Sequence, residues 1–177
     1  MLKKTLLLVV VIMLGFGAMI ATTRDATFAV TESRSLTAGQ PAIWEALTDV
    51  EAWDEWWPGI ETAQLSPGWT EGATLALTLK GRPEKTPAIV DGFNRGRQVS
   101  WTRPGVLGST TRTLLRIERS GEGVVVSMES RLHGPQAFLA RFTGEESFRN
   151  YQELVLRSLQ ESLVAKGTGL PGEQEGA

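Results

Sequence analysis

Four of the six tryptophans lie between residues 41 and 59, and this run constrains the fold more than any other part of the chain. Ile43, Trp44 and Leu47 have the spacing of one face of a helix. Pro41 suits the first turn of that helix, where a missing N–H costs nothing. The run therefore predicts a short amphipathic helix at its start.

A second short helix is predicted over residues 50–57. Asp49 is expected to cap it, because the carboxylate can accept hydrogen bonds from the backbone N–H groups that follow. Large aromatic side chains at helical spacing are more often part of a core than of a ligand site. We therefore expect Trp44, Trp53 and Trp56 to pack inside the protein, whereas Trp57 and Trp69 could lie at a cavity mouth or at a membrane surface instead.

Alternating apolar and polar residues predict strands on both sides of these helices. A first strand is expected over residues 26–36. Residues 60–132 contain no sustained helical period, and Gly, Pro and Asn turns divide them into the strands of an antiparallel meander. The last of these strands is as clear as the one before it, because Met128 and Ser130 fall on its apolar face while Arg131 falls on the other.

A helical period follows the last strand and extends to about Lys166, with an interruption expected at Thr143 and Gly144. An apolar stripe runs along it and consists of Phe148, Tyr151, Val155, Leu159 and Leu163. This helix must lie on an apolar surface. The order of elements predicts an α+β domain in which one long C-terminal helix covers a curved antiparallel sheet.

The charge and the residue types exclude several classes of function. The 18 Lys and Arg residues include Lys3 and Lys4, so the chain beyond the N-terminal segment has 16 of them against 20 Asp and Glu. Without a basic cluster, a nucleic-acid partner is not expected. Because cysteine is absent, disulfides and Cys-ligated zinc are excluded. His133 is the only histidine. We expect no metal and no cofactor.

The N-terminal segment is predicted to target the protein to a membrane and to stay outside the folded domain. Lys3 and Lys4 precede a charge-free run from Thr5 to Thr23. As a helix this run would be about 28 Å long, which just spans a hydrocarbon core of about 30 Å. We favour an uncleaved single-pass anchor with the domain on the non-cytoplasmic side, because the two lysines are expected to stay in the cytoplasm.

Two alternatives to the anchor remain. In a signal peptide the hydrophobic region would be residues 6–14, and cleavage near Gly15 and Gly17 would release a secreted or periplasmic domain. A buried core helix is the third interpretation, although a charge-free stretch of this length is difficult to bury in so small a domain.

The run from Ile43 to Pro58 resembles the entry pattern VW-x-x-x-x-D-x-x-x-W-x-x-W-x-P of the polyketide cyclase/dehydrase-like and lipid-transfer family, in the START/Bet v 1-like (SRPBCC) superfamily. The matching positions are Ile43, Trp44, Asp49, Trp53, Trp56 and Pro58. The resemblance covers about residues 27–166. It implies a helix-grip fold, whose sheet wraps around the terminal helix and leaves a hydrophobic cavity. The family shares no catalytic motif, so the resemblance supplies no catalytic residue.

We expect the chain to have three parts, an anchor or signal peptide (1–23), a START/Bet v 1-like domain (24–166) and a flexible tail (167–177). Inward-facing positions of the strands and of the long helix would line the cavity. The predicted ligand-binding residues are Trp101, Thr113, Met128, Ser130, Phe148, Tyr151 and Val155. Among these, the hydroxyl of Tyr151 is the best single polar contact for a ligand.

Four side chains are candidates for acid–base chemistry, but no spacing links them. Asp91 is expected to belong to the turn around Asn94, His133 to lie at a solvent-facing strand end, and Arg131 to face outward. Tyr151 is expected inside, where simple packing is the alternative to a role in binding. Since no acid–base pair emerges, we favour a protein that is not an enzyme.

Three classes of function remain. The favoured one is a membrane-tethered or exported binding protein for a hydrophobic small molecule, such as a lipid, quinone or polyketide-like compound, held between sheet and helix. The first alternative is a polyketide cyclase or dehydratase. The second is a protein-interaction module without a small ligand, which an exposed apolar patch and an absent cavity would favour.

Overall fold

The computed structural model describes residues 2–121 and 123–168. The helices are α1 (Leu2–Thr22), α2 (Gln40–Thr48), α3 (Trp53–Trp56), α4 (Pro135–Thr143) and α5 (Glu145–Thr168), with short 3-10 turns η1 (Val50–Ala52) and η2 (Val106–Gly108). The strands are β1 (Thr27–Leu36), β2 (Ile60–Ser66), β3 (Thr74–Leu79), β4 (Arg82–Asn94), β5 (Gln98–Pro104), β6 (Thr110–Ser120) and β7 (Gly123–His133).

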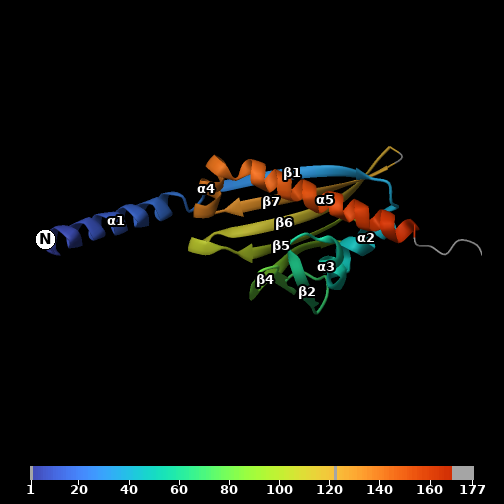
Figure 1. The fold of residues 1–177 in the computed structure, drawn as a ribbon, viewed down its shortest axis with the longest axis horizontal. Helices are drawn as coiled ribbons and strands as arrows, with labels where there is room; N and C mark the ends of the chain where they lie inside the picture. Colours follow the sequence, from blue (N-terminus) through green and yellow to red (C-terminus); the bar gives the residue numbers. More distant parts are fainter. Residues whose placement is uncertain (1, 122, 169–177) are drawn as a thin grey trace, which may run out of the picture.

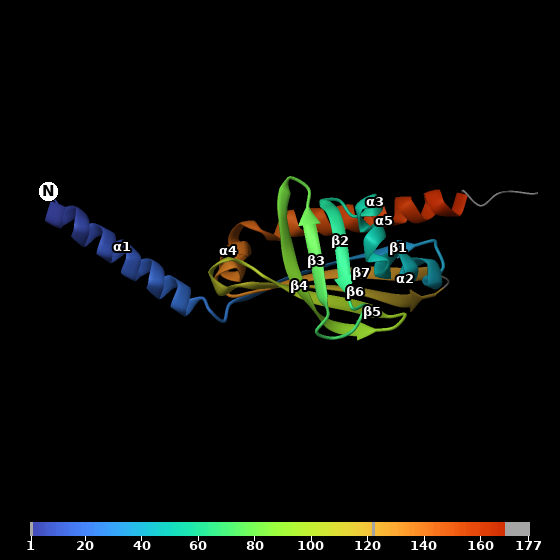
Figure 2. The same ribbon diagram turned by 90° about the horizontal axis from the view of Figure 1, so that it is seen from below.

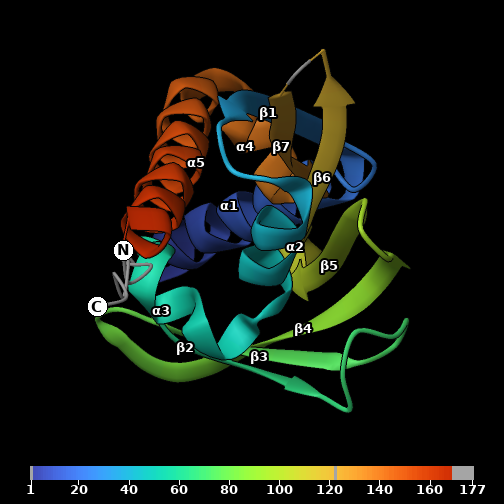
Figure 3. The same cartoon turned by 90° about the vertical axis from the view of Figure 1, so that its right-hand side faces the viewer.

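All seven strands form one antiparallel sheet in the order β1-β7-β6-β5-β4-β3-β2. Consecutive strands pair from β2 to β7, and β1 joins the free side of β7. Figure 3 shows the sheet curling so that its two ends approach α5, which runs along the concave side above β1 and β7 (Figure 1). The predicted helix-grip fold is confirmed.

Side-chain alternation decides which strand face meets the core. In β7, the inward face carries five buried residues: Val124, Val126, Met128, Ser130 and Leu132. In β6, Thr113, Leu115 and Ile117 are buried in the same way. The predicted faces of these two strands are therefore correct, and the concave face is continuous across their antiparallel register.

The helices after β1 form as predicted, but the role of Asp49 differs. Pro41 lies in the first turn of α2, where Ile43 and Leu47 are buried. The side chain of Asp49 makes no capping hydrogen bond. Instead its backbone N–H donates to Glu45 O at 2.8 Å and closes α2. The prediction of an Asp49 cap is wrong, because none of the backbone N–H groups that follow donates to the Asp49 carboxylate, and only the backbone carbonyl of Asp49 accepts, from Ala52 N at 3.3 Å.

The break predicted at Thr143 and Gly144 separates α4 from α5. A Cβ at Gly144 would lie 2.8 Å from Ala140 O and 3.1 Å from Ala140 Cβ, so the tight turn requires glycine there. Beyond the break, α5 buries Val155 and Leu159, as its apolar stripe predicts. Helix α5 ends at Thr168, and the rest of the predicted tail lies outside the described residues.

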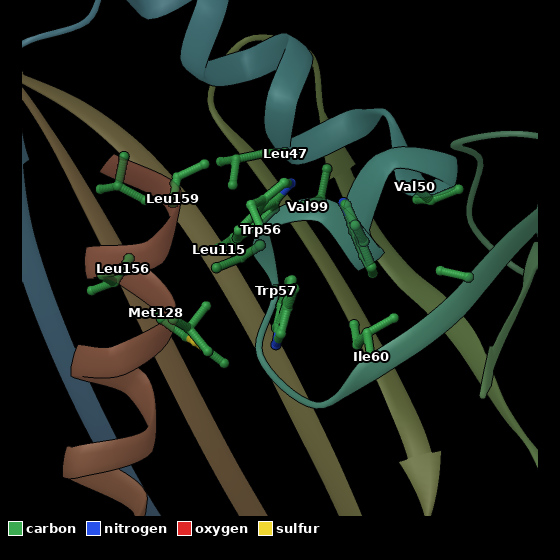
Figure 4. Close-up of a cluster of buried hydrophobic side chains, with 14 of the residues drawn as sticks. Leu47, Val50, Trp56, Trp57, Ile60, Val99, Leu115, Met128, Leu156 and Leu159 are labelled. Atoms are coloured by element: carbon green, nitrogen blue, oxygen red, sulfur yellow. The ribbon is translucent and has the colours of Figure 1, made fainter. Parts of the chain in front are cut away.

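The main hydrophobic core lies where α2, α3 and the second half of α5 meet the sheet (Figure 4). Trp53 and Trp56 are 0% and 3% exposed, which confirms their predicted place in the core. The two apolar clusters use only residues from Ala26 onward. A fragment that begins at Arg24 therefore retains every described residue of both clusters, and we expect it to fold without α1.

Helix α1 projects away from the domain, next to α4 (Figures 1 and 2). Its segment Thr5–Thr22 is long and apolar enough to cross a membrane, as an anchor or signal sequence would be. The described side chains of this segment are not buried against the domain. The alternative of a buried core helix is therefore wrong.

Candidate functional site

A cavity of about 520 Å³ lies between the concave face of the sheet and the first half of α5. Its wall combines buried apolar side chains, such as Ile60 and Leu77, with the hydroxyl-bearing Thr113 and Ser130. The exposed residues Lys80 and Ser147 also line it and mark its mouth. A volume of this size falls within the range of about 300–1,000 Å³ that is typical of small-molecule sites.

Six of the seven predicted ligand-binding residues line this cavity: Trp101, Thr113, Met128, Ser130, Phe148 and Tyr151. The seventh, Val155, does not. It is 1% exposed and belongs to the main apolar cluster. Since Val155 lies one turn beyond Tyr151, the cavity ends where α5 begins to pack directly on the core.

The sequence pattern did not predict the basic part of the cavity wall. Arg103 lines the cavity and lies two residues after Trp101 on β5, so strand alternation places both side chains on the same face. Lys80 and Arg82 flank the turn between β3 and β4 and also line the cavity. The alternation that identified Trp101 could have identified Arg103, whereas the two turn residues depend on how the sheet curls.

Two tryptophans form an aromatic wall that a third supports. Trp57 and Trp101 line the cavity with ring centroids 5.9 Å apart. Behind them the fully buried Trp53 lies 4.9 Å from Trp57 and 5.3 Å from Trp101. Gly59, at φ 89°, turns the chain from α3 into β2 just after Trp57, a conformation that favours glycine. Trp57 is 4% exposed, so it lies in the buried wall of the cavity and not at the mouth or at a membrane surface, the two places that the sequence left open for it.

The Tyr151 hydroxyl is held in place by two hydrogen bonds. It accepts one from Trp57 Nε1 at 2.9 Å and donates one to Pro58 O at 3.3 Å. Burial raises the pKa of Tyr151, while the hydrogen bond from Trp57 and the charge of Arg103 act in the opposite direction and only reduce this rise. The phenol is therefore neutral at pH 7, and it would have to give up its bond to Pro58 before donating to a ligand.

Asp91 lies inside β4, on the convex face of the sheet, and not in the turn at Asn94 as the sequence predicted. Its carboxylate accepts hydrogen bonds from Ser100 Oγ at 2.6 Å and from Arg112 Nε at 3.1 Å, and a further one from Thr102. Burial alone would raise the pKa of Asp91, but these hydrogen bonds and the charge of Arg112 outweigh it and lower the pKa. In this position on β4, Asp91 contacts residues of β5 and β6 that the spacing of the sequence does not reveal.

The other two acid–base candidates also lie outside the cavity. His133 is exposed at the end of β7, as predicted. Arg131 faces outward, as predicted, and pairs with Glu129 at 2.8 Å. Within residues 2–121 and 123–168, no group of three or more His, Cys, Asp or Glu side chains is arranged to hold a metal ion. Of the four candidates, only Tyr151 belongs to the site, where it is 40% exposed and so lies at the open side of the cavity rather than fully inside as predicted.

Solved structures share the fold at low sequence identity. A protein from Nitrosomonas europaea is 16% identical and matches 81% of this chain and 97% of its own, with a TM-score of 0.63. Norcoclaurine synthase from Thalictrum flavum, in complex with dopamine and hydroxybenzaldehyde, is 12% identical over 80% of this chain and 89% of its own, with a TM-score of 0.60. At such identities the likeness shows the fold alone.

A third structure is the di-domain ARO/CYC StfQ of the steffimycin biosynthetic pathway, which is 10% identical with a TM-score of 0.63. The match covers 85% of this chain and 54% of StfQ. No protein with a curated description matches the sequence significantly. The family described as polyketide cyclase/dehydrase and lipid transport, however, matches residues 27–166. Because this match covers most of the chain, the protein belongs to that family.

Proposed function

We propose that the protein binds a hydrophobic small molecule, such as a lipid, quinone or polyketide-like compound, between the sheet and α5. The cavity of about 520 Å³, walled by Trp57, Trp101 and Met128, is the observation that carries this proposal. Burial of apolar ligand surface against such a wall contributes roughly 25 cal/mol per Å² before the costs of association.

We further propose that α1 anchors the domain to a membrane, with the domain on the non-cytoplasmic side. The segment Thr5–Thr22 has the required length and composition, and Lys3 and Lys4 favour a cytoplasmic N-terminus. In this arrangement residues 1–23 form the anchor and residues 24–166 the binding domain. Cleavage of a signal peptide, giving a secreted or periplasmic protein, is the alternative.

Fractionation of cells tests the anchor. The full chain is expected in the membrane fraction, and a fragment that starts at Arg24 in the soluble fraction. A soluble mature protein that starts near Ala18 would replace the anchor by a cleaved signal peptide.

Binding is tested by mass spectrometry of the apolar compounds that co-purify with the domain and by uptake of a hydrophobic fluorescent probe. Ser130→Trp should block probe uptake, because Ser130 points into the cavity. Ser127→Trp is the matched control, since Ser127 lies on the same strand with its side chain on the convex face. Equal uptake by both variants would refute binding in this cavity.

A cyclase or dehydratase is the second candidate, because the titratable hydroxyl of Tyr151 lines the cavity. It would predict turnover of a polyketide that Tyr151→Phe abolishes while probe binding persists, with the bell-shaped pH dependence of an acid and a base. Against it, the Tyr151 hydroxyl is already engaged by Trp57 and Pro58. The interaction-module alternative is disfavoured by the cavity itself.

A further inference from the structure

We propose that the cavity selects amphiphiles with an anionic head group, a carboxylate or a phosphate monoester, which Lys80, Arg82 and Arg103 recognise. This inference rests on the proposed function, since it names the class of hydrophobic ligand. All three cations line the cavity. Within the described part of the chain, no Asp or Glu lines it. A net positive wall is notable in a chain whose formal charge is −2.

The three side chains have no ionic partner within residues 2–121 and 123–168, unlike several basic residues outside the cavity. Arg112 contacts Asp91 at 3.1 Å, Arg131 contacts Glu129 at 2.8 Å, and Lys166 contacts Glu55 at 3.0 Å. No carboxylate lies within 4.0 Å of Lys80, Arg82 or Arg103 in the same part of the structure. The positive charge at the cavity is therefore available to a ligand.

The positions of Trp101 and Arg103 along β5 would hold the apolar end and the charged end of the ligand apart. Arg103 is half-buried and follows the buried Trp101 by two residues on the same strand face. This spacing corresponds to roughly 6.5 Å along the strand. A head group at Arg103 would thus place the adjoining hydrocarbon directly against Trp101. Lys80 and Arg82 lie at the exposed turn between β3 and β4, at the cavity mouth, and add positive potential there.

The chemistry of guanidinium favours an anion over a neutral polar group. Planar N–H donors match carboxylate and phosphate oxygens in pairs, and hydrogen bonds between charged groups are about twice as strong as neutral ones. A neutral ligand that entered the cavity would displace water from half-buried Arg103 without replacing its hydrogen bonds. An acidic head group replaces them.

Matched twelve-carbon probes test this inference on fragment 24–177, whose core is complete without α1. Affinities of dodecanoate, dodecyl phosphate and dodecanol are measured at pH 7.5 by displacement of a neutral fluorescent probe. We expect at least one anionic probe to bind about tenfold or more tightly than dodecanol, with the preference decreasing as salt is added. The tighter of the two anions identifies the head group.

Arg103→Gln should remove most of this preference, because it weakens binding of the anionic probes far more than it changes binding of dodecanol. The paired change Lys80→Gln with Arg82→Gln should reduce it less, because these side chains are exposed. Arg116→Gln, at an exposed position on the convex face of β6, is the control and should keep the full preference.

The possible failures are distinguishable. If dodecanol binds but neither anion binds more tightly, the anionic-head inference is wrong and the proposed function stands. The same conclusion follows if Arg103→Gln weakens dodecanol and the anions equally. If no probe binds at all, the proposed function itself fails.

Discussion

The two halves of α5 differ in what lies beneath them. The apolar stripe continues from Phe148 and Tyr151 in the first half to Val155 and Leu159 in the second, yet of these four residues only the first two line the cavity of about 520 Å³. The second half meets the main core, where Trp56 and side chains of α2 fill the space above the sheet (Figure 4). In the described part of the chain, no helix side chain fills the space under the first half in this way. The cavity therefore exists because α2 and α3 cover only one end of the concave face.

The largest expected effect is at the filled end. Trp56→Ala removes a side chain that is 3% exposed and should lower the free energy of unfolding by about 3–5 kcal/mol. This is a large part of the stability of an ordinary domain. Chemical denaturation of fragment 24–177 measures it. A variant with wild-type stability but no probe binding would show that Trp56 belongs to the ligand site and not to the core.

A matched pair of insertions compares the two ends directly. Val99 and Thr113 have the same shape, face the same interior from β5 and β6, and are 0% and 8% exposed. Val99→Phe should cost about 1–3 kcal/mol, because its surroundings are filled. Thr113→Phe should stay within about 1 kcal/mol of wild type, because the ring can enter the cavity.

The same two variants should also differ in their binding of a hydrophobic probe. Thr113→Phe is expected to reduce uptake of this probe. The folded molecules of the Val99→Phe variant are expected to bind it as the wild type does. Denaturation curves and probe titrations on both variants provide the measurement. Equal stability losses would mean that the two ends are equally packed, contrary to the structure.

Periodicity in the sequence predicted the faces of strands and helices but not the spaces between them. Strand alternation is local, so it correctly predicts that Met128 and Ser130 face the interior. Val155 was assigned to the cavity by the same kind of argument, although it packs in the core. Whether an inward-facing residue meets another side chain or a void depends on contacts between elements far apart in the sequence.

The hydrogen-bond partners of the polar side chains were the least predictable part of the structure. The hydrogen bonds of Asp91 come from β5 and β6, and those of Tyr151 come from Trp57 and Pro58, 94 and 93 residues away. The register of the sheet and the path of the chain after α3 create these pairs. Neither can be obtained from spacing along a single element.

Tyr151→Phe should have a moderate effect at the cavity end. The variant loses the hydroxyl that accepts from Trp57 Nε1, which should cost about 1 kcal/mol because water in the cavity can replace it. Urea denaturation at pH 7 measures this loss. Probe binding should persist, since packing of the ring is unchanged. A loss of several kcal/mol would indicate that this end is as tightly packed as the other.

The pH dependence of Tyr151 sharpens the same comparison, because it is the only tyrosine in the chain. Burial raises its pKa above the ordinary value of about 10. As the pH rises, the unfolded chain therefore loses this proton first. The stability that the neutral phenol contributes is complete below about pH 10 and is lost as the pH rises through the folded-state pKa. Titration of phenolate absorbance should give a pKa above 10, and a value at or below 10 would contradict burial of the hydroxyl.

The smallest expected effect concerns Asp49, at the junction between α2 and η1. The sequence pattern predicts a helix cap, whose removal would cost about 1 kcal/mol. In the structure, however, the Asp49 side chain makes no capping hydrogen bond, and the junction is held by the backbone bonds Asp49 N to Glu45 O and Ala52 N to Asp49 O. An alanine retains both bonds. Asp49→Ala should therefore change the free energy of unfolding by less than about 0.5 kcal/mol, as for other exposed substitutions that remove no specific contact. Denaturation of fragment 24–177 with and without the substitution measures this difference. A loss of about 1 kcal/mol would show that the carboxylate caps the second helix in solution, and that the filled end depends on a side-chain contact as well as on apolar packing.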